Sequence, residues 1–317
     1  MTLQEQIRAN RLRSVVSVAG FGLLLLLLAG AIGLALDLSL GVVALVGALA
    51  YAIFALWRSR SLVARLTNAQ ELPENAARPL RRLVENVSIA AGLPVTPEVR
   101  VVNDAAPNAF AAGLRPKNSY VGVTTGLLAT MPQRELEAVI AHEVAHIRNR
   151  DTYLMTVATV FAGVIALIAD IGFRSLAWGG GRSRNALVAV AALVGFLLAP
   201  YAALLLRLSL SRRREYLADA GAAELLNDPE AMALALRRLA ADQTTVRYAD
   251  ASTAHLWVES PTDRVESDRR GVLALSGLFN THPPLADRIA ALETAGGFQT
   301  PDTLPDNVSF AVEHGLA

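Results

Sequence analysis

The chain has 317 residues, of which 53% are hydrophobic and 18% charged, and its formal net charge is +1 at pH 7. A soluble domain usually carries about a quarter charged residues, so the composition indicates a membrane protein, while a net charge this small argues against nucleic acid as a partner. The absence of cysteine excludes disulfides and thiolate ligands, so a bound metal must be held by His, Asp or Glu.

Two long segments near the start of the chain contain no charged residue. They cover residues 15–36 and 38–57 and are separated only by Asp37. About 20 apolar residues are enough to cross a bilayer, so we expect a transmembrane hairpin at residues 15–57 after a cytoplasmic N-terminus at residues 1–14. A secretory signal peptide is the alternative, but it would be shorter and would end in a small-residue cleavage site. Arginines on both sides of the hairpin indicate that both of its ends are cytoplasmic: Arg8, Arg11, Arg13, Arg58, Arg60 and Arg65.

A second pair of apolar segments lies at about residues 152–173 and 186–206. The loop between them carries three arginines, which is unfavourable for a loop that is exported across a membrane. We therefore expect residues 152–206 to form a hairpin that spans the membrane or dips into it, with a buried hairpin of a soluble domain as the alternative. An even number of crossings leaves residues 58–151 and 207–317 on the same side of the membrane.

The remaining residues have the patterns of helices and a few short strands. A helix is expected at residues 76–91, because Gly92 and Pro94 are typical stop signals. Another helix is expected at about residues 133–150, and residues 207–317 have mainly helical patterns. Short β-branched or alternating segments, separated by Pro and Gly, indicate strands at residues 98–103, 108–113 and 119–127.

The helix expected at residues 133–150 contains the sequence His142-Glu143-Val144-Ala145-His146. Positions i and i+4 differ by only about 40° around a helix axis, so both imidazoles project from one face and can bind a single Zn²⁺. Glu143 can reach a metal-bound water without binding the metal itself. The alternative is two buried core histidines beside a salt-bridged glutamate, which needs a cation because an unpaired buried glutamate costs several kcal/mol.

The neighbouring residues indicate that the histidine face is the buried face of this helix. Ala141 and Ala145 fall on the opposite face, together with charged residues. Four apolar residues share the side of the histidines: Leu136, Val139, Ile140 and Ile147.

A catalytic zinc usually has three protein ligands and one open position for water. Glu215 and Asp219 are again spaced i, i+4 on an expected helix. Glu215 can supply the third ligand, and Asp219 can accept a hydrogen bond from the free ring nitrogen of a ligand histidine, which fixes its tautomer. Ordinary helix salt bridges to Arg212–Arg214 are the alternative for both residues, and the histidine pair elsewhere in the chain favours the ligand role.

These motifs together resemble the HtpX-type membrane metallopeptidases, relatives of the prenyl-protein CAAX endoproteases. The resemblance covers nearly the whole chain, and the combination is far more specific than the HExxH motif, which many unrelated proteases share. It implies one Zn²⁺ per chain, with Glu215 as the third ligand. The motifs follow one another in the family's order: the first apolar hairpin, Asn108-Ala109-Phe110-Ala111, His142 to His146, the second apolar hairpin, Ser211 to Asp219, and Thr281-His282-Pro283-Pro284-Leu285 with Arg288.

The resemblance also implies roles for two segments outside the metal motif. Residues 108–111 form a strand that borders the cleft and pairs with an extended substrate by β-strand addition, in which main-chain hydrogen bonds bind without demanding a particular sequence. His282 lies near the site, where a donor can stabilise the oxyanion, and its alternative is a turn residue that introduces a helix beginning at Pro283 or Pro284. His255 and His314 match no motif and are expected at the surface.

The sequence therefore predicts an α+β membrane protein: a mainly helical zincin-like protease domain with a small β-sheet, formed by residues 58–151 and 207–317, plus two apolar helical hairpins. The function that the resemblance implies is that of a zinc metalloendopeptidase of the cell (inner or plasma) membrane, which cleaves misfolded or damaged membrane proteins on the cytoplasmic side in quality control and stress response. The expected partners are unfolded or membrane protein substrates and the lipid bilayer, but not nucleic acid. Small residues such as Ala29 and Gly33 are compatible with a homo-oligomer.

Three other functions fit part of the sequence. An intramembrane protease would place the HExxH motif inside an apolar span, whereas charged residues flank the motif closely here. A catalytically inactive metal-binding scaffold or adaptor would not need Glu143, because a structural zinc has no use for a general base. A zinc transporter would need ionisable residues inside the spans, and only Asp170, near the end of one, qualifies.

Overall fold

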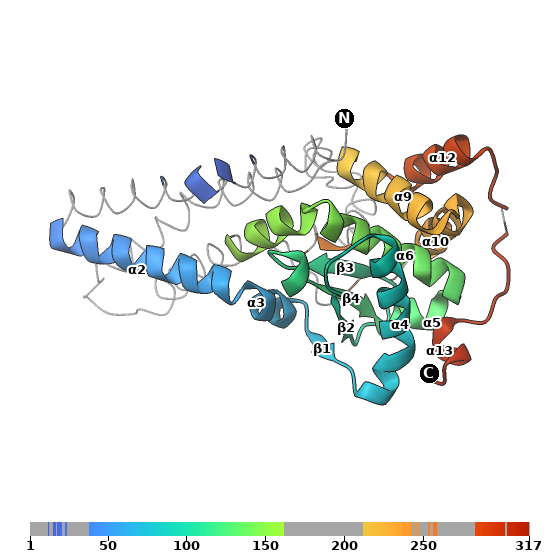
Figure 1. Cartoon of the computed structure of the whole chain (residues 1–317), viewed down its shortest axis with the longest axis horizontal. Coiled ribbons are helices and arrows are strands. Elements are labelled where there is room, and N and C mark those ends of the chain that lie inside the picture. Colours follow the sequence, from blue (N-terminus) through green and yellow to red (C-terminus); the bar gives the residue numbers. More distant parts are fainter. Residues whose placement is uncertain are drawn as a thin grey trace, which may run out of the picture.

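The computed structural model describes residues 38–161, 212–242, 283–301 and 303–316, with some single positions elsewhere that include 253 and 256–258. Figure 1 shows these parts in colour. In chain order the elements are α2 (Leu38–Trp57), α3 (Ser59–Leu66), β1 (Ala69–Glu71), α4 (Glu74–Ala90), β2 (Glu98–Val102), β3 (Ala109–Ala112), the short helix η1 (Pro116–Asn118), β4 (Tyr120–Thr124), α5 (Thr125–Thr130), α6 (Gln133–Arg148), α9 (Arg212–Leu226), α10 (Pro229–Ala241), α12 (Leu285–Gly296) and α13 (Phe310–Glu313).

The strands form one mixed sheet in the order β1-β2-β4-β3. The central strands β2 and β4 are parallel, with Val101 opposite Val123, and the outer strands β1 and β3 run antiparallel to their neighbours. The prediction of a mainly helical chain with a small β-sheet is confirmed. β3 is an end strand of the sheet, and on the side that faces away from β4 it forms only an isolated bridge, from Phe110 to Trp257.

The predicted strand at residues 119–127 is too long, because a helix begins at Thr125. The Thr124 side chain causes this change, since its hydroxyl accepts a hydrogen bond from the Leu127 amide at 3.1 Å, the usual contact of a helix N-cap. β1 was not predicted. It has only three residues, too few for an alternating pattern to stand out in the sequence.

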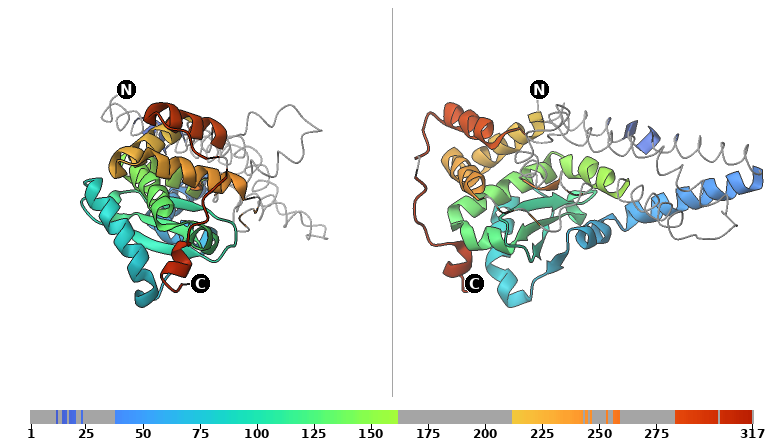
Figure 2. Two further views of the ribbon diagram at one scale, coloured as in Figure 1. Left: turned by 90° about the vertical axis from the view of Figure 1, so that its right-hand side faces the viewer. Right: turned by 180° about the vertical axis from the view of Figure 1, so that it is seen from behind.

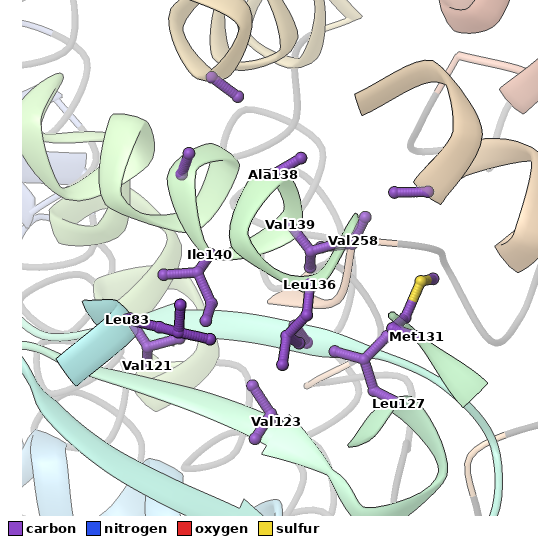
Figure 3. Close-up of a cluster of buried hydrophobic side chains, with 14 of the residues drawn as sticks. Leu83, Val121, Val123, Leu127, Met131, Leu136, Ala138, Val139, Ile140 and Val258 are labelled. Atoms are coloured by element: carbon purple, nitrogen blue, oxygen red, sulfur yellow. The ribbon is translucent and has the colours of Figure 1, made fainter. Parts of the chain in front are cut away.

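One face of the sheet is covered by α4, α5 and α6 through a continuous apolar core (Figure 3). Val121 and Val123 of β4 belong to this core, where Val121 lies near Ile140 of α6 and Val123 near Leu136 (Figure 3). The opposite face carries a second cluster, in which Val63 of α3 and Tyr120 of β4 are fully buried. The sheet is therefore covered on both faces, and α6 lies directly on one of them.

α6 is buried on both of its faces, which differs from the sequence prediction. The pattern places Ala141 and Ala145 on the face away from the core, yet they are only 0% and 2% exposed. α9 covers this face at close range, because a Cβ added at Gly221 would lie 3.2 Å from the Cβ of Ala145. Figure 2 shows α9, α10 and α12 on the side of α6 that faces away from the sheet. Small residues thus let α9 approach the HExxH helix.

None of the helices in the described part of the chain reaches the combined length and hydrophobicity that crossing a membrane requires. The transmembrane hairpin predicted at residues 15–57 is therefore not confirmed, and most of its first helix lies outside the described residues. Most of the second hairpin, predicted at residues 152–206, lies outside the described residues. α2 extends away from the sheet (Figure 1) and exposes large apolar side chains: Val42, Val43, Val46, Leu49, Ile53, Phe54 and Trp57.

Replacing Thr124 with valine should destabilise the domain by about 1–3 kcal/mol, the usual effect of leaving buried polar groups unpaired. Its fully buried hydroxyl accepts hydrogen bonds from the Leu127 amide and, at 2.9 Å, from the Asn108 amide. Valine keeps the shape but removes these two bonds and the bond that the hydroxyl donates to the Asn108 carbonyl at 3.2 Å. Urea unfolding followed by circular dichroism measures the change. Thr130→Val is the matched control, because the Thr130 hydroxyl bonds carbonyls of its own helix, and an equal loss in both variants would contradict this explanation.

Candidate metal centre

The structure brings the two predicted histidines of α6 together. His142 and His146 are 1% and 4% exposed, and their ring centroids lie 4.7 Å apart with the planes at 90°. The Nε2 atoms of the two rings are 3.2 Å apart. Glu143, the residue after the first histidine, is buried beside them.

α9 supplies a third group to the same point. Glu215 has Oε1 3.6 Å from Nε2 of His146 and Oε2 3.7 Å from Nε2 of His142. One ligand atom from each of the three residues lies within 4.8 Å of the others, an arrangement that could hold a metal ion. Four-coordinate zinc holds N and O ligands at about 2.0–2.2 Å, which separates neighbouring ligand atoms by roughly 3.3–3.6 Å. The three side chains therefore fit one zinc ion.

The other ring nitrogen of each histidine lies beside a buried carboxylate. Nδ1 of His142 is 2.9 Å from Oδ1 of the predicted partner Asp219, and Nδ1 of His146 is 2.9 Å from Oδ2 of Asp151. The hydrogen bond to Asp151 places the ring proton of His146 on Nδ1, and the ion-pair contact with Asp219 favours the same tautomer of His142, so both Nε2 atoms face Glu215. Although burial opposes it, the hydrogen bond to Asp151 and the charge of Glu215 raise the pKa of His146 to about 9, so the converging groups hold a cation among them, which is a proton when no metal is bound. This donor set therefore fits a metal ion.

Asp151 was not predicted from the sequence. α6 ends at Arg148, and Arg150 has a φ of 64°. This left-handed conformation turns the chain sharply, so Asp151 returns to His146 as the next helical segment begins. A carboxylate directly beyond the end of a HExxH helix is the sequence signal that could have identified it.

A buried arginine from α12 neutralises the acidic residues of α9. The Arg288 side chain is fully buried and donates two hydrogen bonds to Asp219, from Nε at 2.8 Å and from Nη2 at 2.6 Å. Its Nη1 lies 3.5 Å from Oε2 of Glu215. The sequence motif contained this residue but gave it no role. Arg288 rather than Arg212 or Arg213, which are exposed, is the cation that pairs with Asp219.

Glu143 has an unusual electrostatic environment. Burial raises its pKa to about 8, and the charge of Glu215 adds to the shift, while His146 and a hydrogen bond from the Ala111 amide oppose it. Burial lowers the pKa of the neighbouring His142, which favours the neutral ring that binds a metal. A buried carboxyl whose pKa lies near neutrality is suited to accept a proton and return it.

The remaining predicted residues fall in three places. The strand residues Asn108 to Ala111 are buried at the edge of the sheet, where the amide of Ala111 reaches Glu143. His282 and His255 lie outside the described residues. His314 is half-buried near the C-terminus, where its ring packs on Phe310 at a centroid distance of 4.2 Å, and it takes no part in the metal centre.

Two histidines one helical turn apart, with a glutamate beside them and a third ligand from a later helix, define a metalloprotease of the HExxH class. Comparison with known proteins then gives the family. The model of peptidase family M48 matches residues 74–295. A "Protease HtpX homolog" from Streptococcus agalactiae is 39% identical over 304 residues, which cover 92% of this chain and 99% of the relative. Another from Listeria monocytogenes is 36% identical over 310 residues, with the same shares covered.

The chain therefore belongs to peptidase family M48 and to its HtpX-type members. The resemblance seen in the sequence is confirmed, and so are the assignments as a metalloprotease and zinc as the cofactor. Family membership favours the protease over the inactive scaffold and the zinc transporter.

Replacing Asp151 with asparagine should weaken zinc binding by about 10–100-fold, the usual effect of losing a carboxylate that orients a ligand histidine. An asparagine can present its NH₂ group to Nδ1, which removes the preference for the tautomer that frees Nε2. Competition with a chromophoric chelator measures the affinity. Glu230→Gln is the control, because it removes one negative charge at an exposed ion pair with Arg134, and an Asp151→Asn affinity equal to that of the control would refute the orienting role.

Proposed function

We propose that this chain is an integral-membrane zinc endopeptidase, which cleaves extended segments of misfolded or damaged membrane proteins on the cytoplasmic side, as part of protein quality control. The position of Glu143 is the observation that supports this proposal most directly. Its carboxylate is buried beside the cluster of His142, His146 and Glu215 and accepts a hydrogen bond from Ala111 on the edge strand β3. A single side chain therefore connects the metal-binding group with the strand assigned to the substrate.

In this proposal His142, His146 and Glu215 hold the ion, and the carboxylates behind the two rings keep them in the metal-binding tautomer. When bound, zinc supplies a Lewis acid that polarises the peptide carbonyl and activates water. Glu143 accepts the proton from the attacking water and passes it to the leaving amine. Burial of the carboxylate strengthens its electrostatic interactions, because the local dielectric constant is lower than that of water.

The position of β3 supports an extended substrate. β3 pairs with β4 on one side only, and Ala109 and Ala111 direct their backbone groups toward the opposite side. A substrate strand that binds these groups would be held through its main chain. This mode of binding suits a protease that clears many unfolded proteins. His282 retains its proposed role as an oxyanion donor.

The proposed membrane location rests on the sequence and on α2. Residues 15–36 and 38–57 lack charges and are flanked by arginines, and α2 exposes large apolar side chains such as Val43 and Ile53. A contiguous exposed apolar surface on one helix favours contact with lipid or with another apolar surface. The proposal places the protease domain on the cytoplasmic side, where the flanking arginines are expected.

Glu143→Gln should retain zinc but lose at least about 10²–10⁴-fold in the rate of casein cleavage, the typical contribution of a general base. The amide cannot accept the proton, whereas all three proposed ligands remain. Zinc content by mass spectrometry and casein cleavage, with and without a chelator, measure both properties. The control is Glu137→Gln on the same helix, outside the cluster. A zinc-loaded Glu143→Gln enzyme as active as this control would refute the proposed role.

The chain should stay in the membrane pellet after extraction of cell membranes with alkaline carbonate, because a hydrophobic hairpin is not released with peripheral proteins. Tags at the two ends should both be protected from protease in intact spheroplasts and be cleaved after lysis. Release into the supernatant would count against membrane integration. Cleavage of either tag in intact spheroplasts would count against the cytoplasmic location of that end.

A further inference from the structure

The outer edge of β3 is already occupied by a distant part of the same chain. The Thr124 amide donates to the carbonyl of Asn108 at 3.0 Å, so by alternation Phe110 bonds β4, while Ala109 and Ala111 face outward. The outward carbonyl of Ala109 accepts a hydrogen bond from the Val258 amide at 2.9 Å. The outward amide of Ala111 bonds Glu143.

Residues 256–258 lie where an added strand would lie. Phe110 and Trp257 form an antiparallel bridge, and their rings pack at a tilt of 58° with centroids 4.8 Å apart. The Trp257 side chain is fully buried in the cluster on the face of the sheet away from α6, which also contains Tyr120 and Met155. The segment therefore binds β3 in both ways available to a peptide, through the main chain and through one large side chain.

Two features distinguish this contact from ordinary core packing. The Val258 carbonyl accepts a hydrogen bond at 3.1 Å from Nη1 of Arg288, the same guanidinium that holds Asp219. The contact is therefore linked to the metal centre through Arg288, which also lies 3.5 Å from Glu215. The indole nitrogen of Trp257 is buried and has no hydrogen-bond partner among the described residues, an unfavourable arrangement that removal of the side chain from this pocket would relieve.

We propose that residues 256–258 occupy the place of a substrate strand, and that the pocket now filled by Trp257 receives a bulky apolar side chain of the substrate. The inference rests on the proposed function of β3 as the substrate-binding strand. A strand that pairs antiparallel with β3 must place the side chain opposite Phe110 on the same face as the Phe110 ring. That side chain enters the space vacated by Trp257, between aromatic and aliphatic groups. Substrate and Trp257 compete for one site, which makes the pocket a determinant of specificity.

A reversible crosslink tests the competition. The chain has no cysteine, so the double variant Ala109→Cys/Val258→Cys has a single disulfide to form. Opposed residues of antiparallel strands have Cα atoms about 4.5–5.5 Å apart, within the range that a disulfide spans. The oxidised variant should cleave casein at least about tenfold more slowly than the same variant after reduction, because a peptide binds only the molecules whose edge strand is free.

The controls separate this inference from the proposed function. The single variant Val258→Cys, taken through the same oxidation and reduction, should show no change in rate. A disulfide-linked enzyme that cleaves as fast as its reduced form would overturn the proposal. Trp257→Ala removes a large core side chain and can fail to fold, whereas the crosslink retains Trp257. If the wild-type enzyme does not cleave casein, this result counts against the proposed function but not against the present inference. The inference is then tested by peptide binding, which does not depend on cleavage.

Peptide binding tests the pocket. Two labelled extended peptides that differ only by phenylalanine or alanine at the central position are titrated into the zinc-loaded Glu143→Gln variant and followed by fluorescence anisotropy. The phenylalanine peptide should bind on the order of tenfold more tightly, because it buries a large apolar surface and brings no polar group into the pocket. The oxidised crosslink, introduced into the Glu143→Gln background, should abolish this difference. Equal affinities of the two peptides for the uncrosslinked protein would overturn the assignment of the pocket.

Discussion

The metal centre depends on the convergence of three groups that repel one another in the absence of a cation. The Nε2 atoms of His142 and His146 are 3.2 Å apart, and each lies within 3.7 Å of a Glu215 oxygen. The carboxylate behind each ring favours a proton on Nδ1, so each Nε2 is left to bind a metal ion or, when no metal is bound, to carry the second proton of an imidazolium. Because the ligands come from both α6 and α9, metal binding also stabilises the contact between these two helices. The small residues Ala145 and Gly221 make this contact close enough for Glu215 to reach the histidines.

Arg288 supplies the other positive charge on which the arrangement depends. Burial of Asp219 without a partner would raise its pKa, but Arg288 and His142 outweigh that effect, and the pKa of Asp219 is lowered. The carboxylate consequently stays ionised and keeps its contact with His142. The same guanidinium bonds the carbonyl of Val258, so one buried side chain joins the helix of the third ligand to the segment that covers β3. Truncation of Arg288 would leave buried carboxylates without their cation, which is far more costly than loss of a surface ion pair.

The parts of the site that could be predicted from the sequence are those set by local geometry. The spacing of His142 and His146 predicts two rings on one helical face, since helical periodicity alone decides it. Glu215 and Asp219 follow the same rule on a second helix, but this spacing does not show that the second helix meets the first. That contact was inferred from the need of the histidine pair for a third ligand and from the resemblance to a family. Asp151 depends on the left-handed turn at Arg150, and no periodic pattern reveals such a turn. The burial of Ala141 was misjudged for a related reason, because small residues next to charged ones give no sign that another helix lies on them.

The feature that was hardest to predict from the sequence is which groups bond the outer edge of β3. Alternation along Asn108 to Ala111 is enough to predict a strand, but the partners of its outward groups come from α6 and from residues more than a hundred positions later in the chain. Glu143 and Val258 together take the two main-chain groups that an incoming strand needs. Under the proposed function, a peptide that binds the amide of Ala111 would displace the Glu143 carboxylate from it and free the carboxylate to receive a proton. Substrate binding and release of the base would then be one exchange of hydrogen bonds at a single backbone amide, and proton transfer would depend on an occupied edge strand.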